Sequence, residues 1–274
     1  MSARDHVIYL DSRRYVVHLP PAFSASAQPA LVVMMDGRGG TPWTAIKSSG
    51  WSPKADEQHF VVAYPEAEKV NPAGPQHFLD NPQMWKTEHG SGDVAYLLAV
   101  LDDVHARFNT DPARVYLAGF SNGAVMACRF ALDQPERVAA IGHVAANFRT
   151  REPTLRRLVP MICFFGKQDP IAPYTGGTVT LPWGLTEQRP DTRETPALWA
   201  RLLGIADAPH VDERPDGVTV TSYGKDVVCY AVDGLGHVWP GGHRLLPEKL
   251  VGASCEKVRA TDMMWDFFRV RSCS

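Results

Sequence analysis

The chain has 274 residues, a formal net charge of −2 and a charged fraction of 21%. This length suits one large α/β domain with a sizeable core, and we expect a single domain over residues 1–274. The near-neutral charge, with no basic stripe or acidic tail, argues against nucleic acid as a partner, and no run reaches the ~18 apolar residues of a membrane span. We therefore expect small molecules as partners.

The N-terminus and the cysteines bear on the compartment and on cofactors. Residues 1–6 lack the apolar core of a secretory signal, so we expect a cytoplasmic protein unless a leader was removed. The 5 cysteines are dispersed and contain no CxxC pair, which argues against a disulfide framework and a zinc site. No HExxH, EF-hand or Walker pattern is present, and we expect neither a metal nor a cofactor.

In chain order, the hydrophobic pattern predicts strands that alternate with helices. Short alternating segments at 7–10 and 14–19 indicate antiparallel strands at a sheet edge, and continuous apolar runs at 30–35 and 60–64 are typical of strands covered on both faces. Apolar residues at helical spacing predict a helix over 93–108. Further strands are expected at 114–118, 138–144, 161–165 and 227–232, and further helices at 124–132, 195–203 and 261–269. This alternation predicts a mostly parallel, doubly wound sheet.

Two stretches rich in Pro and Gly, 66–91 and 170–195, fit neither a helix nor a strand. Loops of this length in a compact domain are usually functional or disordered. In open α/β sheets, ligands bind beyond the carboxyl ends of the strands. We therefore expect both loops to rim the active site.

The pentapeptide Gly119-Phe120-Ser121-Asn122-Gly123 stands between a predicted strand and a predicted helix. Strand, sharp turn and helix form the context of a nucleophile elbow, in which a strained turn projects a serine hydroxyl from the sheet. Glycines two positions on either side of the serine let neighbouring backbone approach closely. Ser121 is therefore the candidate nucleophile.

A serine hydroxyl becomes nucleophilic when an imidazole takes its proton and a carboxylate orients the imidazole. In α/β-hydrolases the chain order is Ser, then Asp or Glu, then His. Asp169 lies just beyond a buried strand, and His237 lies in a glycine-lined loop after the last strand. Because both follow strand ends on the face where Ser121 should emerge, we expect these three residues to form a triad. His243 is the rival histidine.

An attacked ester carbonyl develops negative charge, which needs preorganised hydrogen-bond donors. One donor should be the backbone N–H of Asn122, and we assign the other to the backbone N–H of Arg38 in the loop 36–40. A dinucleotide phosphate cradle in that loop is a weak alternative because Pro42 stands where a third glycine is needed. Trp239, two residues after His237, and Trp85, in the first long loop, are candidate pocket walls.

With these residues in hand, the chain resembles the polyhydroxybutyrate depolymerase and feruloyl esterase-like branch of the α/β-hydrolases, from about Arg14 to the C-terminus. The resemblance implies Ser121 as nucleophile, Asp169 as acid, His237 as base and ester hydrolysis as the reaction. We also expect Tyr174 to contact the substrate. The motifs that carry the resemblance are 111–116 leading into 119–124, 169–174 with Gly176 and Gly177, and the His-x-Trp-Pro-Gly-Gly within 236–242, which is the most specific.

The chain departs from the family pattern at two places. Asp36-Gly37 stands where the family usually has a His-Gly pair, which keeps a backbone donor but changes the electrostatics of the pocket. The segment 204–209 lacks the paired cysteines of many secreted members, which fits a reducing compartment.

We predict a serine carboxylic ester hydrolase of the α/β-hydrolase fold, acting through an acyl-enzyme on small aromatic or hydroxyalkanoate-type esters. Two alternatives remain open. A peptidase or acyltransferase could use the same triad, because loops choose the leaving group and the acceptor. A catalytically silent binding protein of the same fold is the other alternative, and Asp36 motivates it.

Overall fold

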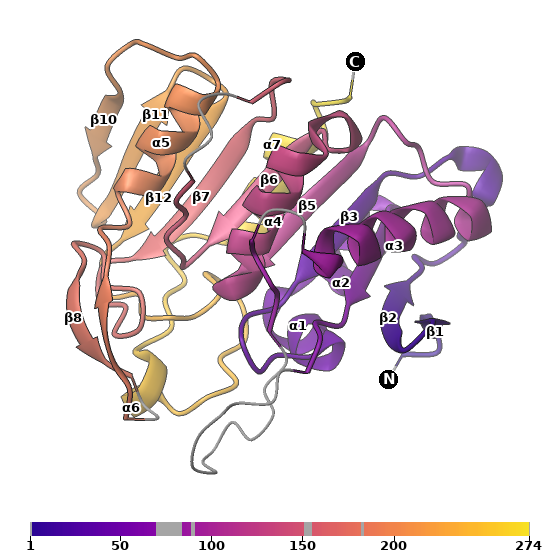
Figure 1. The fold of residues 1–274 in the computed structure, drawn as a ribbon, viewed down its shortest axis with the longest axis horizontal. Helices are drawn as coiled ribbons and strands as arrows, with labels where there is room; N and C mark the ends of the chain where they lie inside the picture. Colours follow the sequence, from indigo (N-terminus) through magenta and orange to yellow (C-terminus); the bar gives the residue numbers. More distant parts are fainter. Residues whose placement is uncertain (1, 70–83, 89–90, 151–154, 182–183, 274) are drawn as a thin grey trace.

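A computed structural model of the chain describes residues 2–69, 84–88, 91–150, 155–181 and 184–273. Among them, ten strands form one sheet in the order β1-β2-β4-β3-β5-β6-β7-β12-β11-β10, and β8 and β9 form a separate hairpin (Figure 1). The strands are β1 (Asp5–Leu10), β2 (Arg13–His18), β3 (Leu31–Met35), β4 (Val61–Pro65), β5 (Val115–Phe120), β6 (Ala140–Val144), β7 (Met161–Gly166), β8 (Gly177–Thr180), β9 (Thr186–Arg189), β10 (His210–Glu213), β11 (Val218–Tyr223) and β12 (Val227–Val232).

The centre of the sheet is parallel and its two edges are antiparallel. Strands β4, β3, β5, β6, β7 and β12 run parallel to one another. Antiparallel pairs join β1 to β2 and β2 to β4 at one edge, and β12 to β11 and β11 to β10 at the other. The prediction of a mostly parallel sheet with antiparallel strands at the N-terminal edge is therefore confirmed.

Helices cover both faces of this sheet, as expected for a doubly wound fold. Side chains of α3, α4 and α5 belong to one apolar layer, and side chains of α1, α2 and α7 belong to the other. None of the described helices is long and apolar enough to cross a membrane. The helices are α1 (Pro42–Ser49), α2 (Trp51–Gln58), α3 (Gly92–Phe108), α4 (Asn122–Asp133), α5 (Glu194–Leu202), α6 (Glu248–Val251) and α7 (Ala260–Phe268).

Aromatic side chains fill the layer between the sheet and α2 and α7. The rings of Trp51 and Phe268 stack with centroids 6.0 Å apart, and those of Phe60 and Trp265 stack at 4.0 Å. Burying such large rings is a main source of stability in a core. The C-terminal helix is thereby packed against the N-terminal half of the chain.

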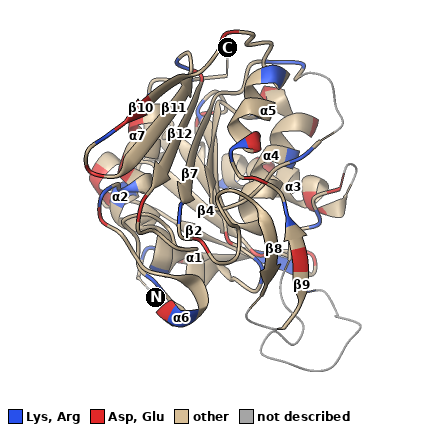
Figure 2. Ribbon diagram, turned by 90° about the vertical axis from the view of Figure 1, so that its left-hand side faces the viewer, with Lys and Arg blue, Asp and Glu red and all other residues tan. Residues whose placement is uncertain are grey.

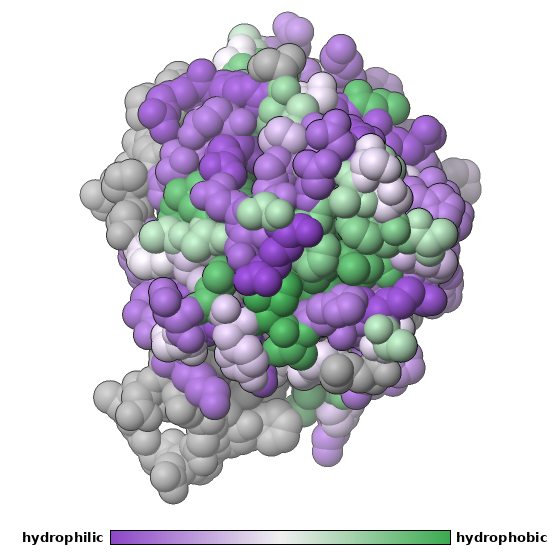
Figure 3. Space-filling view, turned by 90° about the vertical axis from the view of Figure 1, so that its right-hand side faces the viewer, coloured by the Kyte–Doolittle hydropathy of each residue, from purple (hydrophilic) through white to green (hydrophobic). Residues whose placement is uncertain are grey.

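The surface mixes charges and apolar groups. On the face shown in Figure 2, Lys and Arg lie interspersed with Asp and Glu. On the opposite side, where β1 ends the sheet, an apolar area lies in the middle of a largely polar face (Figure 3). On the edge strand itself Tyr9 is exposed, whereas Val7 and Ile8 are half-buried.

The two long stretches without a predicted element have different outcomes. Most of 66–91 lies outside the described residues. The stretch 170–195 is not irregular throughout, because it contains the β8–β9 hairpin and the start of α5. One face of the hairpin is half-buried and the other is exposed. The half-buried face carries Gly177, Val179, Glu187 and Arg189, so burial alternates without an apolar alternation, and this explains why the sequence pattern did not predict the hairpin.

Candidate active site

Ser121 lies at the turn between β5 and α4 with a positive φ of 52° and a ψ of −121°. A non-glycine residue with this backbone is strained and persists only where its surroundings hold it. Close packing of the flanking glycines does so: a Cβ on Gly119 would lie 2.4 Å from the Gly123 carbonyl oxygen, and one on Gly123 would lie 2.2 Å from that of Met35. The Ser121 N–H donates to the Val144 carbonyl at 2.8 Å. The strand–turn–helix geometry of a nucleophile elbow is therefore present.

Asp169 and His237 form a buried hydrogen-bonded pair. The Oδ2 atom of Asp169 lies 2.7 Å from Nδ1 of His237, and the two residues are only 5% and 8% exposed. The other oxygen, Oδ1, accepts the backbone N–H groups of Ile171 and Ala172 at 2.8 and 2.7 Å. An ionised carboxylate can only accept, so it selects the imidazole tautomer with a proton on Nδ1 and a lone pair on Nε2.

The register of the sheet explains why these two residues meet, although they are 68 positions apart in the chain. Strands β7 and β12 are parallel neighbours that end together at the pair Gly166 and Val232. Their following loops therefore leave the sheet at the same edge. The imidazole that lies against Asp169 is that of His237. The rival His243 is held by its backbone N–H, which donates to the Ser48 carbonyl.

Two cavities meet at His237 and Arg38. The first, which we call the serine cavity, has a volume of about 360 Å³. It is lined by Ser121, Asn122, Arg38 and His237, so four of the predicted site residues share one space. Its wall also carries two further arginines, Arg149 and Arg189, and one acid, Glu187.

The second cavity, of about 270 Å³, is the apolar cavity. Its polar wall includes His237, which it shares with the serine cavity. The other polar lining comes from the loop 36–40, Thr44, Ser48, His243 and Arg244. The exposed side chains of Leu245 and Leu246 contribute to it and are 42% and 44% exposed. Its apolar lining consists of Phe120, Val238, Trp239, Leu245, Leu246 and Val251.

Asp36 braces the loop that follows β3. Its Oδ1 atom accepts the N–H of Gly37 at 2.8 Å, and its Oδ2 atom accepts the Thr44 hydroxyl at 2.5 Å. Burial raises the pKa of Asp36, and the two hydrogen bonds oppose that rise. A Cβ on Gly37 would lie 3.1 Å from Cβ of Ser121, so the braced loop packs directly against the elbow. Because Asp36 accepts the Gly37 N–H, the next backbone donor along the loop is that of Arg38.

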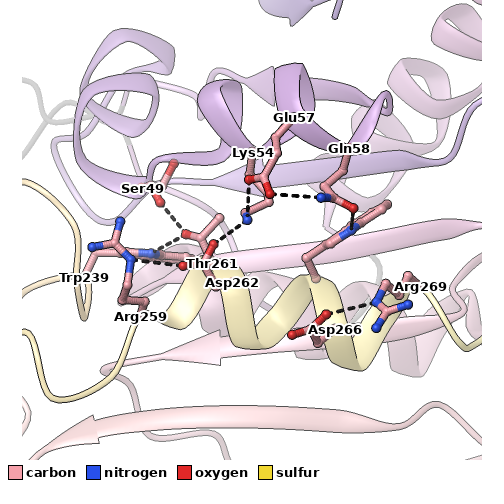
Figure 4. A network of polar contacts seen from close by, with 11 residues as sticks. Ser49, Lys54, Glu57, Gln58, Trp239, Arg259, Thr261, Asp262, Asp266 and Arg269 are labelled. Carbon is pink, nitrogen blue, oxygen red and sulfur yellow. Dashed lines mark hydrogen bonds and ion pairs between the residues drawn. The ribbon is translucent and has the colours of Figure 1, made fainter.

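The three aromatic residues predicted as substrate contacts have different positions. Trp239 lines the apolar cavity, and its indole N–H donates to the Thr261 hydroxyl at 2.9 Å. Figure 4 shows Trp239 and the backbone of Ser49 meeting at Thr261, whose hydroxyl donates to the Ser49 carbonyl. Thr261 thus connects the loop that carries His237 to the first turn of α7 and to the end of α1. Trp85 and Tyr174 are not among the residues that line either cavity.

Trp85 is instead buried between the side chain of Asn122 and the backbone of Asp36. Its own N–H donates to Oδ1 of Asn122 at 2.7 Å, and its carbonyl accepts Nδ2 of Asn122 at 3.2 Å. Its indole N–H donates to the Asp36 carbonyl at 3.1 Å. Tyr174 lies with its ring 5.7 Å from the Arg193 guanidinium, and burial raises its pKa to about 12. The sequence offered no signal for the contacts of Trp85.

The described cysteines and acids do not suggest a metal centre. Among the described residues, no group of three or more His, Cys, Asp or Glu side chains is arranged to hold a metal ion. The five cysteines are unpaired, and Cys128, Cys163 and Cys229 are buried in apolar surroundings. Burial raises the pKa of the Cys128 and Cys163 thiols, which keeps them protonated.

Residues 13–161, more than half of the chain, match the family model described as esterase PHB depolymerase. The chain belongs to the esterase PHB depolymerase family. Membership in this family makes the protein a carboxylic ester hydrolase, which confirms both the resemblance and the enzyme class predicted from the sequence.

Relatives of this PHB depolymerase-family esterase agree with the assignment. Putative esterase NocK of Nocardia uniformis subsp. tsuyamanensis is 28% identical over 287 residues, which cover 97% of this chain and 82% of NocK. Poly(3-hydroxyalkanoate) depolymerase C of Paucimonas lemoignei is 30% identical over 130 residues, which cover 47% of this chain and 30% of the depolymerase. The solved structure of acetyl xylan esterase from Aspergillus awamori aligns with a TM-score of 0.63 at 16% identity, covering 87% of this chain and 94% of that one. The structural match confirms the α/β-hydrolase fold.

Proposed function

We propose that this esterase works through a triad of Ser121, His237 and Asp169 and forms an acyl-enzyme. The observation that carries the proposal is the buried 2.7 Å contact between Asp169 and His237, in a site where His237 and the strained Ser121 line one cavity. A positioned carboxylate, an imidazole and a serine on a sharp turn are the parts that acyl transfer requires.

In the first half of the reaction, Oγ of Ser121 attacks the ester carbonyl carbon while Nε2 of His237 takes the hydroxyl proton. The carbonyl oxygen becomes an oxyanion, which accepts hydrogen bonds from the backbone N–H groups of Asn122 and Arg38. The bond to the alcohol oxygen then breaks, and His237 returns its proton to the leaving alcohol. An acyl group remains esterified to Ser121.

In the second half, water attacks the acyl carbon and His237 accepts one of its protons. The tetrahedral intermediate collapses, the bond to Oγ breaks, and the proton on His237 passes to Ser121. The carboxylic acid leaves and the starting enzyme is restored. Throughout, Asp169 holds the Nδ1–H tautomer and stabilises the imidazolium that forms in each half.

The cavities support small esters with one apolar group as substrates. The apolar cavity beside His237 has room for a short alkyl chain or one aromatic ring, at about 270 Å³. The serine cavity is also lined by Arg149 and Arg189, which are ion-paired with Glu194 and Glu187. A guanidinium has five N–H donors, so each arginine keeps donors for oxygen atoms such as the hydroxyl or carbonyl of a hydroxyalkanoate. The name of poly(3-hydroxyalkanoate) depolymerase C supports the same substrate type.

The proposal is tested with Ser121→Ala and a series of p-nitrophenyl esters of increasing acyl length, together with aromatic acyl esters. We expect Ser121→Ala to lose turnover and labelling by a fluorophosphonate probe, and to keep the wild-type unfolding temperature. Ser26→Ala, which alters an exposed serine remote from both cavities, should retain both properties. Retained turnover in Ser121→Ala would disprove the triad.

The same assay separates the remaining alternatives. Faster turnover of amides than of matched esters would indicate a peptidase, and ester formation with added alcohols would indicate an acyltransferase. A wild-type protein that neither hydrolyses the esters nor reacts with the fluorophosphonate would be a silent binding protein.

A further inference from the structure

The two backbone donors proposed for the oxyanion lie on separate segments of the chain. Asn122 begins α4, directly after β5, whereas Arg38 lies in the loop after β3. Strands β3 and β5 are parallel neighbours as far as the pair Met35 and Gly119, beyond which no ladder bond joins the two segments. The spacing of the donors therefore depends on whatever connects the segments beyond the end of the sheet.

Trp85 is bonded to both segments. Its backbone N–H and carbonyl pair with the carboxamide of Asn122, at 2.7 and 3.2 Å, so that both polar atoms of this side chain are engaged. Its indole N–H donates to the carbonyl of Asp36 at 3.1 Å. The residue is 2% exposed, and hydrogen bonds in such an environment are strong and expensive to leave unmade.

The segment that carries Trp85 is itself anchored to the body of the protein. The N–H of Lys86 donates to Oδ2 of Asp93 at 2.5 Å, and Asp93, 1% exposed at the start of α3, also pairs with Arg13 of β2. The Arg13 guanidinium lies 3.6 Å from the ring centroid of Tyr96 and 5.4 Å from that of Trp85. The segment of Trp85 is thus joined to β2 and α3 as well as to Asn122 and Asp36.

We infer that Trp85 is a positioning residue that sets the distance between the two halves of the oxyanion hole. The inference rests on the proposed function, because it assumes that the Asn122 and Arg38 amides stabilise the oxyanion. Donors must lie within hydrogen-bond distance of the atom on which the charge develops. A wider spacing therefore reduces the stabilisation of the transition state more than the binding of the substrate. Trp85 acts through its hydrogen bonds to Asn122 and Asp36 and not by touching the ester, which agrees with its absence from the lining of both cavities.

The test is Trp85→Phe, which removes the indole N–H and keeps an aromatic ring. We expect kcat to fall by about tenfold, less than the ~10²–10³ that follows loss of a whole oxyanion donor, while KM changes by less than about twofold. The affinity for a trifluoromethyl ketone, whose tetrahedral adduct carries an oxyanion, should fall by the same factor as kcat/KM. A residue with only a structural role would change neither kcat/KM nor the affinity for the inhibitor.

Trp199→Phe is the matched control. Trp199 is equally buried, and its indole N–H donates to a backbone carbonyl, that of Val159 at 2.9 Å, in the layer under α5. This variant should lose stability to a similar extent but keep wild-type kcat and inhibitor affinity. If Trp85→Phe does not fold, Asn122→Ala removes the paired carboxamide and keeps the backbone donor, and the same fall in kcat at unchanged KM is expected.

Three outcomes contradict the inference. One is a kcat of Trp85→Phe equal to that of Trp199→Phe, and another is a rise in KM alone, which would make Trp85 a substrate contact. The third is a fall in kcat without a matching fall in trifluoromethyl ketone affinity. Failure of the underlying function gives a different pattern, in which Ser121→Ala remains active whatever Trp85→Phe does.

Discussion

Asp169→Asn should abolish most of the activity without changing the fold. The side chain is nearly isosteric, but only one of its two terminal atoms can accept hydrogen bonds. In the wild type, one carboxylate oxygen accepts from the N–H groups of Ile171 and Ala172, and the other faces Nδ1 of His237. The amide oxygen of asparagine should take the position that serves two donors, which turns its NH₂ group toward His237.

The magnitude follows from the cost of the alternative orientation. An NH₂ group that donates to Nδ1 of His237 forces the proton onto Nε2, which then cannot accept the proton of Ser121. Turning the amide round would leave two buried N–H groups unsatisfied, at about 1–3 kcal/mol each. The productive tautomer is therefore disfavoured by about 2–6 kcal/mol, which corresponds to a loss of roughly 30-fold to 10⁴-fold in kcat.

The assay is steady-state hydrolysis of p-nitrophenyl butyrate, with thermal unfolding measured on the same samples. Asp191→Asn is the control, because Asp191 also lies between β7 and α5 and is ion-paired with Arg193 outside the candidate triad. A loss of less than about tenfold in Asp169→Asn, at unchanged unfolding temperature, would refute the orientation argument. Equal losses in both variants would mean that Asp169 has no special role.

Two further predictions concern the loop after β3 and the apolar cavity. Because burial raises the folded-state pKa of Asp36 above its unfolded value, the folded protein binds the proton more tightly, and stability is lost as pH rises from about 4 through the raised pKa. In urea titrations over this pH range, the free energy of unfolding of the wild type should therefore fall relative to that of Asp36→Asn. A difference between the two proteins that stays constant with pH would contradict the prediction. Leu246→Ala should raise KM for aromatic acyl esters by about fivefold and spare the acetate ester, because a lost apolar contact costs about 1 kcal/mol. Leu185→Ala, similarly exposed but outside the lining of both cavities, should leave KM unchanged.

The parts of the site that lie at strand ends could be predicted from the sequence. Buried parallel strands have continuous apolar runs, and their carboxyl ends share one edge of the sheet, so residues that directly follow such runs must lie near one another. Asp169 and His237 follow two such strands, and the GxSxG pattern follows a third. Chain order and local hydrophobicity are sufficient to predict these residues, because pairing of the strands brings their distant loops together.

The exposed strands and the side-chain bridges could not be predicted in this way. Strand β10 is exposed at every residue, and the half-buried face of the β8–β9 hairpin is mostly polar, so neither gives a hydrophobic period. The short helix α1 begins at Pro42, and its N-cap Thr41, which forms a capping box with Thr44, follows two glycines that resemble a loop. Trp85 is bonded to residues 37 and 49 positions away, and one partner in each bond is a backbone group, which every residue type carries.

The unusual Asp36 bears on the choice between an esterase and a silent binding protein. Both carboxylate oxygens are engaged by neighbours in its own loop and α1, and its carbonyl accepts the Trp85 indole. A side chain held in this way braces the loop and does not project a free charge toward the oxyanion. Because Asp36 accepts the Gly37 N–H, the second donor that we propose for the oxyanion is the N–H of Arg38. The Asp36-Gly37 departure from the family pattern therefore leaves the proposed chemistry of ester hydrolysis available, which favours an active esterase.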